Sequence, residues 1–189
     1  MHCMGARFAH RLVITRRRLL QLAAAAGSPM LACAACAAHI VRPWPEAKAV
    51  PALDLADLDG KRWTLGGLAG RVVLLNFWAT WCEPCRLEMP SLESVASRYR
   101  AGGMIVLAVN YREGPAVIRE FLAGMSFKAT ILLDADGDAA AEWTPRVFPS
   151  TVLIGRDGRP TATVLGDLDW NSAAARGLLE PLLAAPAKT

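Results

Sequence analysis

Residues Val72 to Tyr99 read VVLLNFWATWCEPCRLEMPSLESVASRY and carry the strongest indication of the fold. The nearly continuous apolar run at its start is typical of a central strand buried on both faces. A helix is expected to begin at Pro84, because proline suits an early helical position, where its missing N–H is not needed. Cys82 and Cys85 therefore lie where a buried strand meets the start of a helix.

The predicted helix, 84–99, has apolar residues at helical spacing. We expect Leu87, Leu92 and Val95 to face the core, because positions three to four apart lie on one side of a helix. Pro90 lacks the N–H that a helix interior needs, so a kink is expected there.

The rest of the chain alternates between predicted strands and helices. Residues 53–58 alternate like a half-buried strand, Asp59-Gly60 marks a turn, and a return at 63–65 completes an N-terminal strand extension. Further strands are expected at 104–109, 130–133, 151–155 and 161–165, and helices at 115–125, 139–143 and 172–183. The helix at 115–125 is expected to carry on one side Val117, Ile118, Phe121 and Leu122. This order predicts one α/β domain over 51–185, with a mixed central sheet flanked by helices.

Residues 1–38 are predicted to be an export signal or membrane anchor. They hold five arginines and no acid, and residues 19–40, after Arg18, are uncharged and rich in alanine. Sites such as Ala35-Cys36-Ala37 suit a signal peptidase. The segment Thr15-Arg16-Arg17-Arg18-Leu19-Leu20-Gln21 resembles a twin-arginine export signal. A basic region for the general export route and a lipoprotein acylated at Cys33 remain alternatives.

The formal charge of +4 comes from this tail. Without its five arginines the chain has 16 basic and 17 acidic residues, so charge gives no argument for nucleic acid binding. Residues 39–50, with Pro43 and Pro45, are predicted to be an exposed linker to the domain.

Cysteine placement points to redox chemistry. Cleavage after Ala37 would leave Cys82 and Cys85 as the only cysteines, and in an oxidising compartment such a pair indicates a redox couple. Helix geometry brings residues three apart close enough for a disulfide after small adjustments. Unpaired N–H groups at a helix start favour a thiolate, so Cys82 is predicted to be the exposed attacking thiol and Cys85 the resolving thiol.

A structural disulfide and half of a metal site are the alternatives for this pair. A metal site normally needs more Cys or His ligands, and the three histidines lie in or at the end of the tail, at His2, His10 and His39. We therefore expect no metal and no organic cofactor.

The segment from Asn76 to Arg86, followed by Glu88 and Pro90, resembles the TlpA/ResA branch of the thioredoxin-like superfamily. The resemblance spans roughly 50–183 and implies a thioredoxin-like fold and an envelope thiol:disulfide oxidoreductase. Downstream, Phe148-Pro149-Ser150-Thr151 is similar to the cis-proline loop of that family, whereas Pro145-Arg146 departs from its pattern.

Two positions set the chemistry that the resemblance implies. Asn76 stands where ordinary thioredoxins have an aspartate, and an amide cannot accept the proton. Glu88, three residues past Cys85, is predicted to take the proton of the resolving thiol, directly or through water; a solvated helix glutamate is the alternative. Glu83 is either a charge that disfavours the Cys82 thiolate or an exposed spectator.

The cis-proline loop is predicted to bind substrate. The resemblance implies a cis bond at Pro149, whose neighbouring backbone would pair with an extended peptide, and a site lined by Phe148. Trp81 is expected at the exposed rim, whereas Trp78 is expected in the core.

These features predict an enzyme that reduces disulfides in envelope proteins, with apocytochrome c as the leading substrate. It is expected to lie in the periplasm or at the outer face of the cytoplasmic membrane, as a monomer supplied with electrons by a membrane thiol–disulfide donor. The alternative is a thioredoxin-like protein that handles copper, because copper(I) binds thiolates, although such proteins usually add a histidine. A disulfide-forming oxidant is disfavoured by Glu83, which replaces the histidine of strong oxidants. A peroxidase is disfavoured by the lack of a Pro/Thr-flanked lone cysteine.

Overall fold

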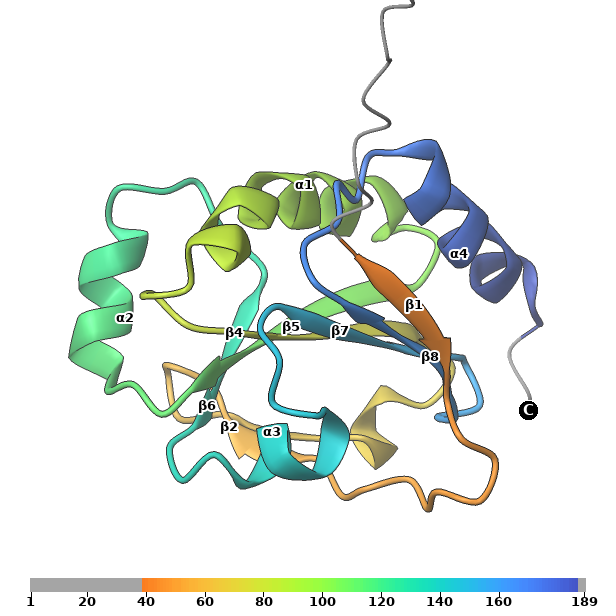
Figure 1. Ribbon diagram of the computed structural model, residues 1–189, viewed down its shortest axis with the longest axis horizontal. Helices are drawn as coiled ribbons and strands as arrows, with labels where there is room; N and C mark the ends of the chain where they lie inside the picture. Colours follow the sequence, from red (N-terminus) through yellow and green to blue (C-terminus); the bar gives the residue numbers. More distant parts are fainter. Residues whose placement is uncertain (1–38, 187–189) are drawn as a thin grey trace, which may run out of the picture. The chain divides into compact units, whose positions relative to one another are not determined.

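The computed structural model describes residues 39–186, in which six strands form a mixed sheet with helices on both faces (Figure 1). The strand order is β1-β8-β7-β4-β5-β6, and a separate pair, β2-β3, forms a second sheet. The strands are β1 (Ile40–Pro43), β2 (Asp54–Ala56), β3 (Arg62–Thr64), β4 (Val72–Trp78), β5 (Met104–Tyr111), β6 (Thr130–Asp134), β7 (Ser150–Ile154) and β8 (Pro160–Leu165). The helices are α1 (Glu83–Tyr99), α2 (Pro115–Leu122), α3 (Asp138–Trp143) and α4 (Ala173–Ala184), with a 3₁₀ turn, η2 (Gly66–Leu68).

Strand β4 is the centre of the sheet, as predicted. All seven of its residues are buried, and it pairs parallel with β5 and antiparallel with β7. Burial on both faces requires apolar residues at successive positions, which is why the run is continuous rather than alternating.

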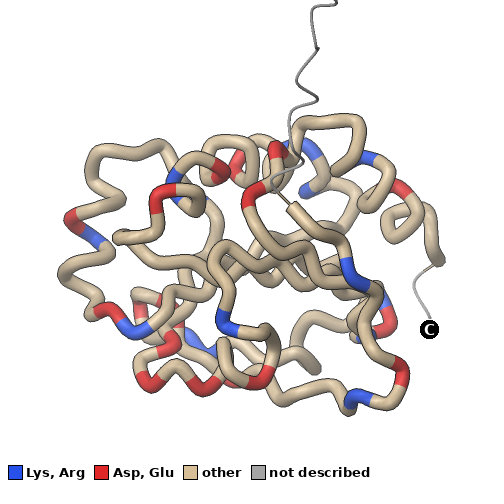
Figure 2. Tube along the Cα trace, viewed as in Figure 1, with Lys and Arg blue, Asp and Glu red and all other residues tan. Residues whose placement is uncertain are grey.

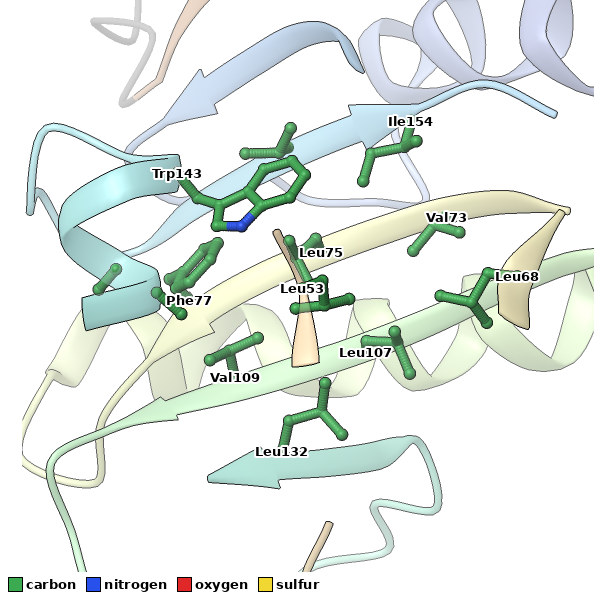
Figure 3. Packing of buried hydrophobic residues seen from close by; sticks show 13 residues of the cluster. Leu53, Leu68, Val73, Leu75, Phe77, Leu107, Val109, Leu132, Trp143 and Ile154 are labelled. Carbon is green, nitrogen blue, oxygen red and sulfur yellow. The ribbon is translucent and has the colours of Figure 1, made fainter. Parts of the chain in front are cut away.

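The two faces of β4 meet different layers. Alternate residues of a strand point to opposite faces, and Val73, Leu75 and Phe77 pack with Trp143 of α3 (Figure 3). Val72 and Leu74 pack on the other face with residues of α1 and α4. Asn76 shares this second face by the same alternation, so it lies under α1.

The prediction that residues 39–50 form an exposed linker is wrong for residues 40–43. Residues Ile40–Pro43 form β1, which pairs antiparallel with β8, and Trp44 N–H donates to the Thr161 carbonyl at 2.9 Å. All four residues of β1 are exposed. An edge strand tolerates proline and buries little, so neither prolines nor hydrophobicity distinguished it from a tether. The predicted signal at 1–38 lies outside the described residues.

Two side chains expected in the core are exposed. Leu87 is 70% exposed and Val117 is 49% exposed. The buried stripe of α1 passes through positions 85, 88, 89, 92, 95 and 96, and Leu87 lies beside it because each residue turns the helix by about 100°. The position facing inward is taken by Glu88.

Other element predictions agree within a few residues. The turn at Asp59-Gly60 separates β2 from β3, and Ser172 caps α4 by accepting a hydrogen bond from Ala175 N–H at 3.1 Å. Among residues 39–186, no helix has both the length and the apolarity that crossing a membrane requires.

Candidate active site

The two cysteines form a disulfide where β4 leads into α1. The Cys82–Cys85 Cα atoms are 5.3 Å apart, and Cys82 is the N-cap of the helix. Its Sγ accepts a hydrogen bond from Cys85 N–H at 3.3 Å, and Pro84 lies in the first turn. This N–H and the helix dipole would stabilise a thiolate at Cys82 once the disulfide is reduced.

The exposure of the cysteines corrects one expectation. Cys82 is 5% exposed and Cys85 fully buried, so Cys82 is the more accessible sulfur but is not an exposed one. Phe148 packs against the hydrophobic cluster that contains both cysteines. The Phe148 ring therefore lies against the hydrophobic surroundings of the disulfide.

Glu88 is a buried carboxylate one turn beyond Cys85 on α1. It is 4% exposed, which excludes the solvated-glutamate alternative. Burial raises its pKa from the ordinary 4.5 to about 7, against hydrogen bonds from Asn76, Leu168 and Trp170 that lower it. A carboxylate with such a pKa can exchange protons near neutral pH.

Asn76 connects the central strand to Glu88. Its Nδ2 donates to Glu88 Oε1 at 2.7 Å and lies 3.0 Å from Thr151 Oγ1 of β7. The sequence showed only that this residue cannot accept a proton. The structure adds that the Asn76 amide forms a hydrogen bond with Glu88, the carboxylate that can accept a proton.

The loop between β8 and α4 supplies the remaining contacts of Glu88. Leu168 N–H donates to Glu88 Oε2 at 3.3 Å, and Trp170 Nε1–H donates to the same oxygen at 3.4 Å. Sequence reasoning missed both residues, which lie about 80 positions from Glu88, and no local pattern marks them.

Aromatic residues surround the cis-proline loop. The Phe148–Pro149 peptide bond is cis, as the family resemblance implied. Trp81 is 64% exposed, and its ring lies edge-on to that of Phe148 with the two ring centroids 6.0 Å apart. Trp78 is buried in the core. Both placements were expected. The ring centroid of Tyr111, a residue that the sequence analysis did not select, lies 4.9 Å from that of Phe148.

A second carboxylate, Glu113, holds the segment that leads to Cys82. It accepts hydrogen bonds from Thr80 N–H at 2.7 Å, Thr80 Oγ1 at 2.5 Å and Asn110 Nδ2 at 2.8 Å. Trp78 and Asn110 are register partners on the parallel strands β4 and β5. Residues that follow the ends of adjacent parallel strands meet at one edge, a rule that would have found this contact from sequence.

Replacing Glu113 with glutamine is expected to lower the free energy of unfolding by about 1–2 kcal/mol. The new amide would direct an NH₂ group at donors that now share a carboxylate. Urea denaturation measures the change. Glu120→Gln, at an exposed site on α2, is the matched control, and equal small effects in both variants would contradict the expectation.

Exposed charged residues of both signs neighbour the residues of the site along the chain. Glu83 and Arg86 are exposed at the start of α1, and Arg112 and Arg146 are exposed on the loops beside Tyr111 and Phe148. Both signs are interspersed over the described elements (Figure 2). Within residues 39–186, no group of three or more His, Cys, Asp or Glu is placed to hold a metal ion.

The chain is similar to known thioredoxin-like proteins. The AhpC/TSA family profile matches residues 47–159. The thiol-disulfide oxidoreductase ResA of Bacillus subtilis (strain 168) is 32% identical over 123 residues, which are 65% of this chain and 69% of that protein.

Solved structures share the fold. A candidate thiol:disulfide interchange protein DsbE from Chlorobium tepidum has a TM-score of 0.66 and 28% identity, covering 71% of this chain and 94% of that one. The exposed lipoprotein thioredoxin (Etrx1) from Streptococcus pneumoniae strain TIGR4 has a TM-score of 0.60 and 26% identity, covering 69% and 99%. With a family match over more than half of its length and this shared architecture, the chain belongs to the AhpC/TSA family of thioredoxin-like proteins.

Proposed function

We propose that this thiol:disulfide oxidoreductase works as a reductant of disulfides in exported proteins, with apocytochrome c as the leading substrate. The observation that carries the proposal is Glu88, a buried carboxylate with a pKa raised by burial to about 7, three residues beyond Cys85 on α1. Such a group serves the step in which the resolving thiol must lose its proton.

The proposed reaction begins with both cysteines reduced. The Cys82 thiolate attacks one sulfur of the substrate disulfide, and the other substrate sulfur leaves as a thiolate and is protonated. Glu88 then accepts the proton of Cys85, directly or through water, and the Cys85 thiolate attacks Cys82 Sγ. The second substrate sulfur leaves as a thiolate, which takes up the proton now held by Glu88 or one from water. Two electrons have then passed to the substrate, and Cys82 and Cys85 have formed their disulfide.

Two features favour the reducing direction. Glu83, between the cysteines, places a negative charge near the Cys82 thiolate, and a less stable thiolate makes the disulfide harder to reduce. Position 83 also lacks the histidine that strong oxidants often carry. The enzyme must be re-reduced after each cycle, for which we propose a membrane thiol–disulfide donor.

An extracytoplasmic location fits the predicted signal in residues 1–38. A solved relative is named an exposed lipoprotein, and a lipid anchor at Cys33 is one of the alternatives for this chain. We propose that the enzyme acts as a monomer in the periplasm or at the outer face of the cytoplasmic membrane.

The reduction potential of the Cys82–Cys85 couple tests the direction. We expect a value near or below that of thioredoxin, about −270 mV, in protein carrying Cys3→Ser, Cys33→Ser and Cys36→Ser. Equilibration with glutathione or dithiothreitol buffers, followed by thiol alkylation, measures it. A value near about −120 mV would instead assign disulfide formation.

A further inference from the structure

The loop between β8 and α4, residues 166–172, runs along α1. Besides the contact of Leu168 with Glu88, Trp170 N–H donates to Ser91 Oγ at 3.1 Å, and Ser94 Oγ lies 2.9 Å from Asn171 Oδ1. The helix positions contacted are 88, 91 and 94, which lie along one side of the helix because they are three apart. The loop is thus held along the helix turn by turn.

Trp170 is fixed within this loop. Its side chain is fully buried in the cluster that includes Leu92 and Val95 of α1 and Leu179 of α4. This close packing restrains the indole, whose Nε1–H is directed at Glu88 Oε2. The hydrogen bond is 3.4 Å long, and Leu168 N–H converges on the same oxygen.

We propose that Trp170 is a positioning residue for Glu88. Its indole N–H holds the carboxylate oxygen Oε2, so that the Glu88 side chain keeps its orientation along α1. The same hydrogen bond helps the buried carboxylate to carry a negative charge. The inference rests on the proposed function, in which Glu88 accepts the proton of Cys85. Trp170 touches neither sulfur and acts through Glu88.

The groups around Glu88 determine what the indole contributes. Asp167, on the same loop, raises the pKa of Glu88 by its negative charge. Cys85 lies one turn back on α1, and β4 and β7 contribute the uncharged Asn76 and Thr151. With a nearby anion and a buried location both opposing ionisation, the N–H donors are what favour the charged form.

The experiment replaces Trp170 with phenylalanine in the full chain, which keeps an aromatic ring and removes the N–H. Carboxyl carbon NMR of glutamate-labelled, oxidised protein follows the titration of Glu88. Its midpoint is expected to rise by about one pH unit, because the charged form loses a donor. The pH profile of disulfide reduction is expected to move in the same direction.

Trp143→Phe is the matched control. Trp143 is also buried, and its Nε1–H donates to the Ala52 carbonyl at 3.1 Å, on the opposite face of the sheet from α1. Like Trp170→Phe, this variant loses one indole hydrogen bond and the volume difference between tryptophan and phenylalanine. It should nevertheless leave both the titration of Glu88 and the pH profile of disulfide reduction unchanged.

The outcomes separate the two hypotheses. An unchanged Glu88 titration in Trp170→Phe, or an equal shift in Trp143→Phe, overturns the role of Trp170. A shifted titration with an unmoved pH profile supports the positioning role and overturns proton transfer by Glu88. If Trp170→Phe does not fold, benzothienylalanine at position 170 keeps the bicyclic volume, removes only the N–H, and gives the same readings.

Discussion

Cys82→Ser is expected to lower the rate at which the reduced enzyme attacks a disulfide by at least about a thousandfold. A hydroxyl at the N-cap still accepts the Cys85 N–H, so the helix start is preserved while the nucleophile is lost. Stopped-flow absorbance with a chromogenic aromatic disulfide measures the attack. All proteins compared carry serine in place of Cys3, Cys33 and Cys36.

Cys85→Ser should behave differently from Cys82→Ser. The first attack proceeds, but no resolving thiol remains, so a mixed disulfide between Cys82 and the substrate accumulates and is visible by mass spectrometry. The structure favours this order because Cys82 is the more accessible sulfur and the one that accepts a helix N–H. Trapping in Cys82→Ser instead of Cys85→Ser would reverse the two roles.

Glu88→Gln is expected to remove a large pH dependence of stability. The pKa of Glu88 is raised in the folded state from 4.5 to about 7, so the folded protein binds the proton more tightly than the unfolded chain. The contribution of Glu88 to stability is therefore most favourable below about pH 4.5, and it falls by about 3 kcal/mol as the pH rises to about 7. The glutamine variant lacks this fall.

Urea denaturation of the oxidised protein between pH 4.5 and pH 8 measures the effect, because the disulfide prevents the cysteines from titrating. The difference between the two curves isolates Glu88 from the other carboxylates. Parallel curves would show that the carboxylate titrates normally in the folded protein and would contradict the assigned environment.

The same variant tests the chemistry. Without a proton acceptor, resolution of the mixed disulfide by Cys85 should slow by about a hundredfold near neutral pH, whereas the first attack by Cys82 should change little. Equal slowing of both steps would indicate a general distortion of α1 rather than a lost proton transfer.

The redox-active cysteine pair, and the strand and helix that carry it, could be predicted from the sequence. A continuous apolar run is typical of a strand buried on both faces, and the cysteines that follow it were therefore expected at the start of the next helix. Predictions of this kind succeed because burial and helix geometry act between neighbours in the chain. The cis bond at Pro149 was found through the family resemblance, since the bare frequency of cis proline is low.

The failures have physical causes too. Leu87 fits the composition of a core helix, yet helix rotation places Glu88 inward and leaves Leu87 exposed. Strand β1 buries none of its residues, so no hydrophobic pattern indicated that it pairs with β8.

The central strand, the start of the following helix and the cysteine pair between them could be predicted without the structure. The protonation state of Glu88 depends on tertiary packing, because burial between α1 and the sheet raises its pKa while Asn76, Leu168 and Trp170 supply the donors that oppose this rise. Leu168 and Trp170 lie about 80 residues away along the chain. Contacts over such a separation follow from how the layers pack, and no pattern among neighbouring residues encodes them.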